Sequence, residues 1–205
     1  MSKPPRELVS SFHYQHDNRE LLIRWVRPYD RDGLAAALDM MSDKALYQRF
    51  FMPIKQLTDR PLEFFTNVDQ VDHIAWGILD TDHPHIPGLG IARCVRDQEY
   101  PHIAEAAVTV PDAFQGQGFG TLLLAILHLS AARNKIHILR SIVLNDNHSF
   151  IRLLKSLGGV SSPGEDNTVV IDQPVYARHS DIPAAVENDR FRELMRRLES
   201  VIYTQ

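Results

Sequence analysis

The chain has 205 residues, of which 44% are hydrophobic and 23% are charged, and its formal net charge is −4. This length supports one sizeable core or at most two small ones, and the composition is that of an ordinary globular protein. The acidic balance, with acids and bases mixed along the chain, argues against a protein that binds nucleic acid through its phosphate backbone.

The first third of the chain is predicted to hold an arm, one strand and three helical segments. Residues 1–19 are polar and form an N-terminal arm, with a short strand around residues 12–14. Residues 20–28 are apolar enough for a strand that ends at Pro28. Helical spacing of apolar residues and capping residues then predict helices at residues 30–42, 44–51 and 58–68.

The middle of the chain changes to strand-like segments. Strands at 73–80 and 89–97 are joined by a turn rich in proline, aspartate and glycine. A third strand at 102–111 leads into the stretch "DAFQGQGFGTLLL", and a helix after its glycines runs to about residue 134. The remaining expected elements are a strand at 136–144, a helix at 147–159 that stops at Gly158, a strand at 168–175 and a charged helix at 187–200. Strands that alternate with helices predict an α/β (α+β) fold around one sheet.

Gly116, Gly118 and Gly120 lie between a strand and a helix, which is the arrangement of an anion-binding site. Glycines let backbone N–H groups converge, and a helix N-terminus adds about half a positive charge. A nucleotide-triphosphate loop would need a lysine before Thr121, and a dinucleotide fingerprint would need a glycine in place of Thr121. The alternative is a turn that only connects a strand to a helix.

A third loop pattern, Q/R-x-x-G-x-G/A, is satisfied by Gln115, Gly118 and Gly120. With the strand before it and the unit "SIVLNDNHSFIRLLKSLGG" after it, residues 104–159 resemble the GNAT superfamily of N-acetyltransferases. The second motif of that family, N-x-x-A-x-x-L-Y-x-x-L-G-F, is matched at Asn147, Leu153, Leu157 and Gly158. The resemblance implies a GNAT-type central mixed, mostly antiparallel sheet flanked by helices.

Two upstream stretches narrow the resemblance. "SDKALYQRFF" at residues 42–51 and "AEAAVTV" at residues 104–110 look like the acetyltransferase domain of bacterial protein-lysine acetyltransferases. The likeness covers about residues 22–175. We therefore expect an acetyltransferase domain at 20–176, between the arm and a C-terminal helical tail at 177–205.

The resemblance also implies a cofactor, acetyl-CoA, which leaves as coenzyme A. The family holds the pyrophosphate with backbone N–H groups of the loop and pairs the pantetheine arm with the strand before it, with one more contact from the asparagine of the second motif. An asparagine at that position is also a strong helix N-cap, and the two roles do not exclude each other. The implied cofactor-binding residues are Val108, Thr109, Val110, Gln115, Gly116, Gln117, Gly118, Phe119, Gly120, Thr121 and Asn147.

Glu105 is the candidate general base. Two-residue alternation places it on one strand face with Ile103, Ala107 and Thr109, where apolar surroundings would raise the pKa of a carboxyl group. The matching glutamate in lysine acetyltransferase domains deprotonates the amine. The alternative is a strand glutamate that faces solvent or an ion-pair partner.

The general acid stays unassigned. Many relatives have a tyrosine where this chain has Leu154, and Gly159 stands where they have an aromatic residue. A coenzyme A thiolate can leave near neutral pH without a side-chain acid, so the change does not indicate an inactive enzyme. On the helix before the sheet, Tyr47 and Arg49 are candidates for the acceptor entrance, whereas we favour core positions for Phe50 and Phe51.

Other features point to a cytoplasmic protein without a metal. The opening residues lack the apolar core of a secretory signal, and "LLLAIL" after Thr121 falls far short of a membrane span of roughly 20 residues. The single cysteine, Cys94, is expected to be a buried inert thiol, and His83 and His85 lack a third metal ligand nearby in the sequence. The arginines of the tail helix are balanced by glutamates, which predicts a solvated or subunit-contacting helix and leaves a homodimer open.

Together these observations predict an acetyl-CoA-dependent N-acetyltransferase that transfers the acetyl group directly to an amine. The upstream resemblance alone makes a protein lysine the preferred acceptor. The alternatives are an enzyme that acetylates small amines and a catalytically silent module that binds acyl-CoA. An oxidoreductase that uses a dinucleotide is more distant, because Thr121 stands where its fingerprint needs glycine.

Overall fold

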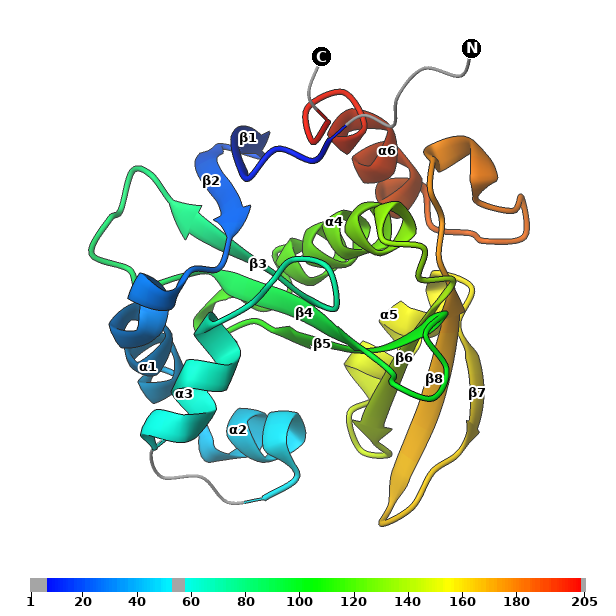
Figure 1. Ribbon diagram of the computed structural model, residues 1–205, viewed down its shortest axis with the longest axis horizontal. Helices are drawn as coiled ribbons and strands as arrows, with labels where there is room; N and C mark the ends of the chain where they lie inside the picture. The colour runs from blue at the N-terminus through cyan, green and yellow to red at the C-terminus, as the bar shows by residue number, and fades with distance from the viewer. Residues whose placement is uncertain (1–6, 53–57, 204–205) are drawn as a thin grey trace.

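The computed structural model describes residues 7–52 and 58–203, so the start of the predicted arm lies outside the described residues. Its strands form one sheet in the order β1-β2-β3-β4-β5-β6-β8-β7 (Figure 1), and the neighbours are antiparallel except for the parallel pair β5 and β6. The strands are β1 (Ser11–His16), β2 (Arg19–Trp25), β3 (His73–Asp80), β4 (Gly90–Arg96), β5 (Ile103–Thr109), β6 (Ile138–Leu144), β7 (Val160–Pro163) and β8 (Thr168–Pro174). The helices are α1 (Arg31–Asp39), α2 (Asp43–Phe50), α3 (Asp59–Thr66), α4 (Phe119–Arg133), α5 (His148–Ser156) and α6 (Asp189–Leu198), with short 3₁₀ turns at Pro28–Asp30, Asp112–Phe114 and His179–Asp181.

The predicted architecture, a mixed and mostly antiparallel sheet flanked by helices, is confirmed. The strand β7 is new relative to the sequence prediction, because its four residues are all exposed and carry no alternation of apolar side chains. It lies at the edge of the sheet and ends at Pro163, and an edge is where a strand tolerates proline.

The core is built around α4, which is buried on every side. All residues from 121 to 131 are buried, as expected of a helix that is apolar around its whole circumference. One side of α4 packs on β3 and β4, where Trp76 Nε1 donates a hydrogen bond to Ser130 Oγ at 2.8 Å. In the parts of the chain that the structure describes, no helix is long and apolar enough to cross a membrane.

The other side of α4 is covered by α6, as Figure 1 shows. This contact with α4 was not predicted from the sequence, whereas the charged residues of the helix, such as Glu193 and Arg196, are exposed as predicted. Its apolar stripe is buried within the same chain, and burying a side chain of this kind stabilises the fold by about 2 kcal/mol. The buried residues of α6 are Phe191, Leu194, Met195 and Leu198.

The sheet opens between β5 and β6. These strands pair only where Ile103–Glu105 lies beside Ile138–Arg140. Beyond that point β5 stays paired with β4 up to Thr109, and β6 stays paired with β8 up to Leu144. Among the described residues, the later half of β5 therefore has no strand partner on its β6 side, and a wedge-shaped gap opens in the sheet.

Candidate active site

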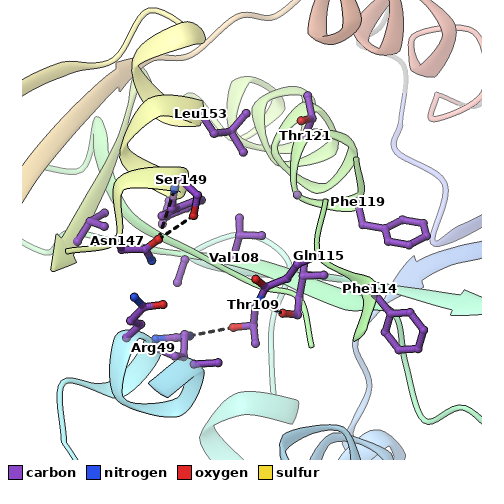
Figure 2. Close-up of a pocket in the computed structure, with 18 of the residues that line it drawn as sticks. Arg49, Val108, Thr109, Phe114, Gln115, Phe119, Thr121, Asn147, Ser149 and Leu153 are labelled. Carbon is purple, nitrogen blue, oxygen red and sulfur yellow. Dashed lines mark hydrogen bonds between the residues drawn. The ribbon is translucent and has the colours of Figure 1, made fainter. Parts of the chain in front are cut away.

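A cleft of about 480 Å³ lies at this opening. Figure 2 shows that its walls come from elements far apart in the sequence: Arg49 enters from α2, Val108 and Thr109 from β5, and Asn147, Ser149 and Leu153 from the start of α5. The remaining wall is formed by the glycine-rich turn and the first residues of α4. A cleft of this size is in the range of pockets that bind small molecules and cofactors.

The glycine-rich turn has the shape that its sequence predicts. Gly116 and Gly118 have φ of +73° and +85°, in the left-handed region that favours glycine. Gly118 is the N-cap of α4, and the Gln115 side chain braces the turn by donating from Nε2 to the Val110 carbonyl at 3.1 Å. At Gly120 neither the backbone nor the packing requires glycine, since an added Cβ would lie 3.6 Å from Leu153 on α5, an ordinary van der Waals contact.

The backbone N–H groups of residues 116–121 are available to a ligand. Within the described residues, none of them donates a hydrogen bond to another part of the protein, whereas the next amide, that of Leu122, bonds to the Gly118 carbonyl at 3.0 Å. Free amides at the start of a 15-residue helix carry a partial positive charge and suit a phosphate group. The free amides of this turn therefore suit the pyrophosphate of a coenzyme A thioester.

The structure brings nearly all of the predicted site residues to the one cleft. Gln117 is the exception, because it is partly buried outside the cleft lining and its Nε2 donates to the Ala113 carbonyl at 3.0 Å. Phe119 has its ring in the core, so only its backbone is free to meet a ligand. The predicted residues that line the cleft are Glu105, Val108, Thr109, Val110, Gln115, Gly116, Gly118, Phe119, Gly120, Thr121 and Asn147.

Asn147 has the N-cap role that its sequence position predicts and keeps a donor free for the second predicted role, contact with a cofactor. Its Oδ1 accepts a hydrogen bond from the backbone N–H of Phe150 at 3.3 Å, so the residue is the N-cap of α5. Ser149 Oγ donates to the same oxygen at 3.2 Å. The Nδ2 group of Asn147 has no hydrogen-bond partner in residues 7–52 and 58–203, which leaves a donor at the wall of the cleft.

Glu105 lines the cleft but is exposed, which corrects the expectation that its carboxylate is surrounded by apolar side chains. Alternation along β5 places Ile103, which is buried, on the same strand face, but Ala107 and Thr109 are only partly buried, because the core takes Ala104 and Ala106 from the opposite face. Glu105 nevertheless lines the cleft, where a molecule that enters from solvent can reach its carboxylate.

Arg49 is the charged neighbour of Glu105 in the cleft. Burial lowers the pKa of Arg49, and the Glu105 carboxylate partly opposes this by favouring the charged guanidinium. Arg49 Nε donates to Thr109 Oγ1 at 3.1 Å, and the guanidinium carbon lies 5.0 Å from the centroid of the Phe50 ring. These contacts hold a positive charge beside the candidate base, on the side of the cleft opposite α5 (Figure 2).

Sequence reasoning missed part of the lining on α2 and α5. Leu154, at the position where relatives have tyrosine, is fully buried, while its neighbour Leu153 lines the cleft. Among the described residues no tyrosine lines the cleft, so the structure supplies no phenol in its place. Phe51, predicted to be in the core, is 41% exposed and lines the cleft, because α2 ends there in a left-handed conformation with φ of 58°.

Comparison with known proteins agrees with this geometry. Residues 20–160 match the family model described as an acetyltransferase (GNAT) domain. The chain is 34% identical over 138 residues to "Acetyltransferase Pat" of Mycolicibacterium smegmatis, an alignment that covers 67% of this chain and 40% of that protein. It is 26% identical over 158 residues to "Acetyltransferase PA5475" of Pseudomonas aeruginosa, covering 76% of this chain and 83% of that one.

Solved structures share the fold. The GNAT domain of S. lividans PAT superposes with a TM-score of 0.71 at 23% identity, over 84% of this chain and 99% of that domain. The acetyltransferase yncA of Salmonella typhimurium, whose structure contains its cofactor acetyl-CoA, superposes with a TM-score of 0.59 at 19% identity, over 77% of this chain and 94% of that one. Because the family match extends over more than half of the residues, this chain belongs to the GNAT family of acetyltransferases.

Proposed function

We propose that the chain is an acetyl-CoA-dependent N-acetyltransferase that transfers the acetyl group to an amine in one direct step, with Glu105 as the general base. The observation that carries the proposal is the set of unengaged N–H groups at residues 116–121, at one end of a cleft that also holds Glu105. The unpaired edge of β5 between them gives an extended ligand a backbone to pair with. Bound acetyl-CoA supplies the acetyl group as a thioester.

Different residues of the cleft bind the cofactor and accept the proton of the acceptor. The amides at the start of α4 neutralise and orient the pyrophosphate, and Asn147 Nδ2 and the backbone of residues 108–110 position the arm that carries the thioester. Glu105 accepts the proton that the ammonium form of the acceptor must lose before its nitrogen has a lone pair for attack. Water at the open mouth of the cleft protonates the leaving thiolate.

The acceptor class we propose is a lysine of a protein. Support comes from the likeness of residues 42–51 and 104–110 to protein-lysine acetyltransferase domains. It also comes from the apolar side chains at the cleft mouth, since Phe51 lines the cleft and Tyr47 and Met52 beside it are 45% and 57% exposed. Exposed aromatic and methionine side chains of this kind favour contact with a macromolecule.

We propose the cytoplasm as the compartment of the protein. The chain has a single cysteine, Cys94, which is buried and whose pKa burial raises to about 12.

The proposed acceptor class can be tested by following coenzyme A release and acetyl-lysine together. We expect the chain to acetylate lysines of an added lysine-rich protein, detected by mass spectrometry, faster than it acetylates polyamines, amino acids or aminoglycosides. Release of coenzyme A with small amines alone would contradict the protein acceptor but keep the enzyme. If no acceptor supports turnover while acetyl-CoA still binds, the chain is a silent acyl-CoA-binding module.

A ligand-induced rise in melting temperature tests the cofactor itself. Binding to the folded state stabilises a protein by RT ln(1 + [L]/Kd), which is about 2.7 kcal/mol when the ligand is present at 100 times Kd. For a protein of this size we expect acetyl-CoA to raise Tm by about 5–10 °C under that condition. NAD at the same concentration should leave Tm unchanged, and a larger shift with NAD would contradict the assignment of the glycine-rich turn.

A further inference from the structure

Arg190, in the first turn of α6, lies against the glycine-rich turn. It lines the same cleft as the glycines. A Cβ added at Gly118 would collide with Cζ and Nη2 of Arg190, so the guanidinium rests directly on the backbone at that glycine. Arg190 stands 30 residues beyond the end of the GNAT family match, and that match therefore assigns it no role.

Contacts with the glycine-rich turn and with β1, a strand outside the family match, hold Arg190 in this position. Its Nη2 donates to the Gln117 carbonyl at 3.3 Å and lies 3.2 Å from Nε2 of His16 on β1, and that Nε2 is itself 3.0 Å from the Gln117 carbonyl. Farther along α6, Arg197 donates to the Gln15 carbonyl at 2.9 Å. The helix is thereby fastened to β1, and the guanidinium is ordered before any ligand arrives.

Most of the hydrogen-bonding capacity of Arg190 is unused. Among residues 7–52 and 58–203, all of its side-chain hydrogen bonds come from Nη2, so Nε and Nη1 have no protein partner there. The carboxylate in reach is that of Asp17, at 3.8 Å from Nη2 and 76% exposed, which makes a weak and solvent-screened ion pair. A guanidinium has five N–H donors in a planar fork that matches the oxygens of a phosphate.

We propose that Arg190 binds the diphosphate of the acyl-CoA cofactor, beside the amides of residues 116–121. This inference rests on the proposed function and adds to it a residue that binds the cofactor from the C-terminal helix. The diphosphate is favoured over the other phosphate of coenzyme A, on the ribose, because the guanidinium lies on Gly118, next to the amides at the start of α4. The amides and the cation would approach the same anion from two elements.

The test is the affinity of the full chain for coenzyme A, measured by calorimetry. We expect Arg190→Gln to raise the Kd of coenzyme A about tenfold, as loss of a charge-assisted hydrogen bond does, and Arg190→Lys to recover part of the affinity. Arg196→Gln is the matched control, because this arginine is on the same helix, 57% exposed and paired with Glu193.

Truncated ligands show which part of coenzyme A accounts for a loss of affinity in Arg190→Gln. If Arg190 contacts the diphosphate, the variant loses the same factor for 3′-dephospho-coenzyme A as for coenzyme A, and nothing for pantetheine. A loss that disappears with the dephospho ligand would place Arg190 on the ribose phosphate, and a loss that persists with pantetheine would make it a structural brace; either result overturns the inference. If wild type and Arg190→Gln bind coenzyme A equally well, the inference about Arg190 fails and the proposed function is unaffected. If wild type does not bind coenzyme A, the proposed function fails.

Discussion

Replacing Glu105 by glutamine is expected to lower kcat by about a thousandfold and to leave the affinity for acetyl-CoA within about twofold. Glutamine keeps the size of the side chain but cannot accept a proton, and a positioned general base contributes about 10²–10⁴ in rate. The amides proposed to bind the cofactor lie at the other end of the cleft, in the turn and the start of α4, so the substitution leaves them intact. Steady-state kinetics with a lysine-bearing acceptor and calorimetry with acetyl-CoA measure the two effects separately.

The pH profile of this variant distinguishes a lost base from a distorted site. Without a base, only acceptor that is already deprotonated reacts, and the free-amine fraction of lysine rises about tenfold per pH unit below its pKa of about 10.4. The rate of Glu105→Gln should therefore climb about tenfold per pH unit, more steeply than that of wild type. The matched control is Glu99→Gln, in the exposed connection before β5. Wild-type kcat in the Glu105 variant would refute the assignment of this residue.

Acidification from pH 6.5 to 5 is expected to lower the free energy of unfolding by about 3 kcal/mol, through two buried histidines. Burial lowers the pKa of His128 from 6.5 to about 3, and burial together with the Arg93 guanidinium lowers that of His73 to about 4. His128 is fully buried, and its Nδ1 accepts a hydrogen bond from the Tyr176 N–H at 3.3 Å. His73 Nε2 lies 3.1 Å from Nη1 of Arg93, which is itself buried.

Acidification lowers the free energy of unfolding because the unfolded chain binds more protons than the folded chain. Below pH 6.5 the unfolded chain protonates both histidines while the folded chain keeps them neutral, so protons favour unfolding, by about 1.4 kcal/mol per pH unit for each group. The loss is complete only below the folded values, near pH 4 for His73 and pH 3 for His128. Carboxylates with lowered pKa values, such as Asp69 and Asp80, add their own loss only at still lower pH than this window.

Urea unfolding at several pH values between 5 and 6.5 measures this dependence. His128→Gln should reduce the slope of unfolding free energy against pH by about 1.4 kcal/mol per unit, whatever its effect on stability at neutral pH. His85→Gln, at an exposed turn, is the control and should leave the slope unchanged. An unaltered slope in the His128 variant would mean that this histidine becomes charged in the fold without cost.

Short-range patterns in the sequence were sufficient to predict most of the secondary structure and the shape of the glycine-rich turn. The strand-like segment before a turn rich in proline, aspartate and glycine predicted β3 at its observed bounds, and the spacing of Gln115, Gly118 and Gly120 predicted a turn whose amides are free at a helix start. These features depend on residues within a few positions of one another, where backbone sterics and helix termini are decided. The exposed strand β7 was missed because it carries no such local signal.

Residues far apart in the sequence meet only because of the tertiary structure. Alternation along β5 put Glu105 and Ile103 on one face, but the surrounding tertiary structure decided that Ile103 is buried there while Glu105 is exposed. The contact of Arg190 with Gly118 likewise depends on how α6 docks on α4.

The amino-acid sequence by itself determined most of the elements, the anion-binding turn and the family resemblance, because each depends on short-range spacing. The tertiary structure decided the opening of the sheet, the exposure of Glu105, and the placement of Arg49 and Arg190 in the cleft. The physical reason is that the period of a helix or strand specifies the face that each side chain occupies. The neighbours of that side chain across a cleft depend on strand pairing and helix docking between distant segments.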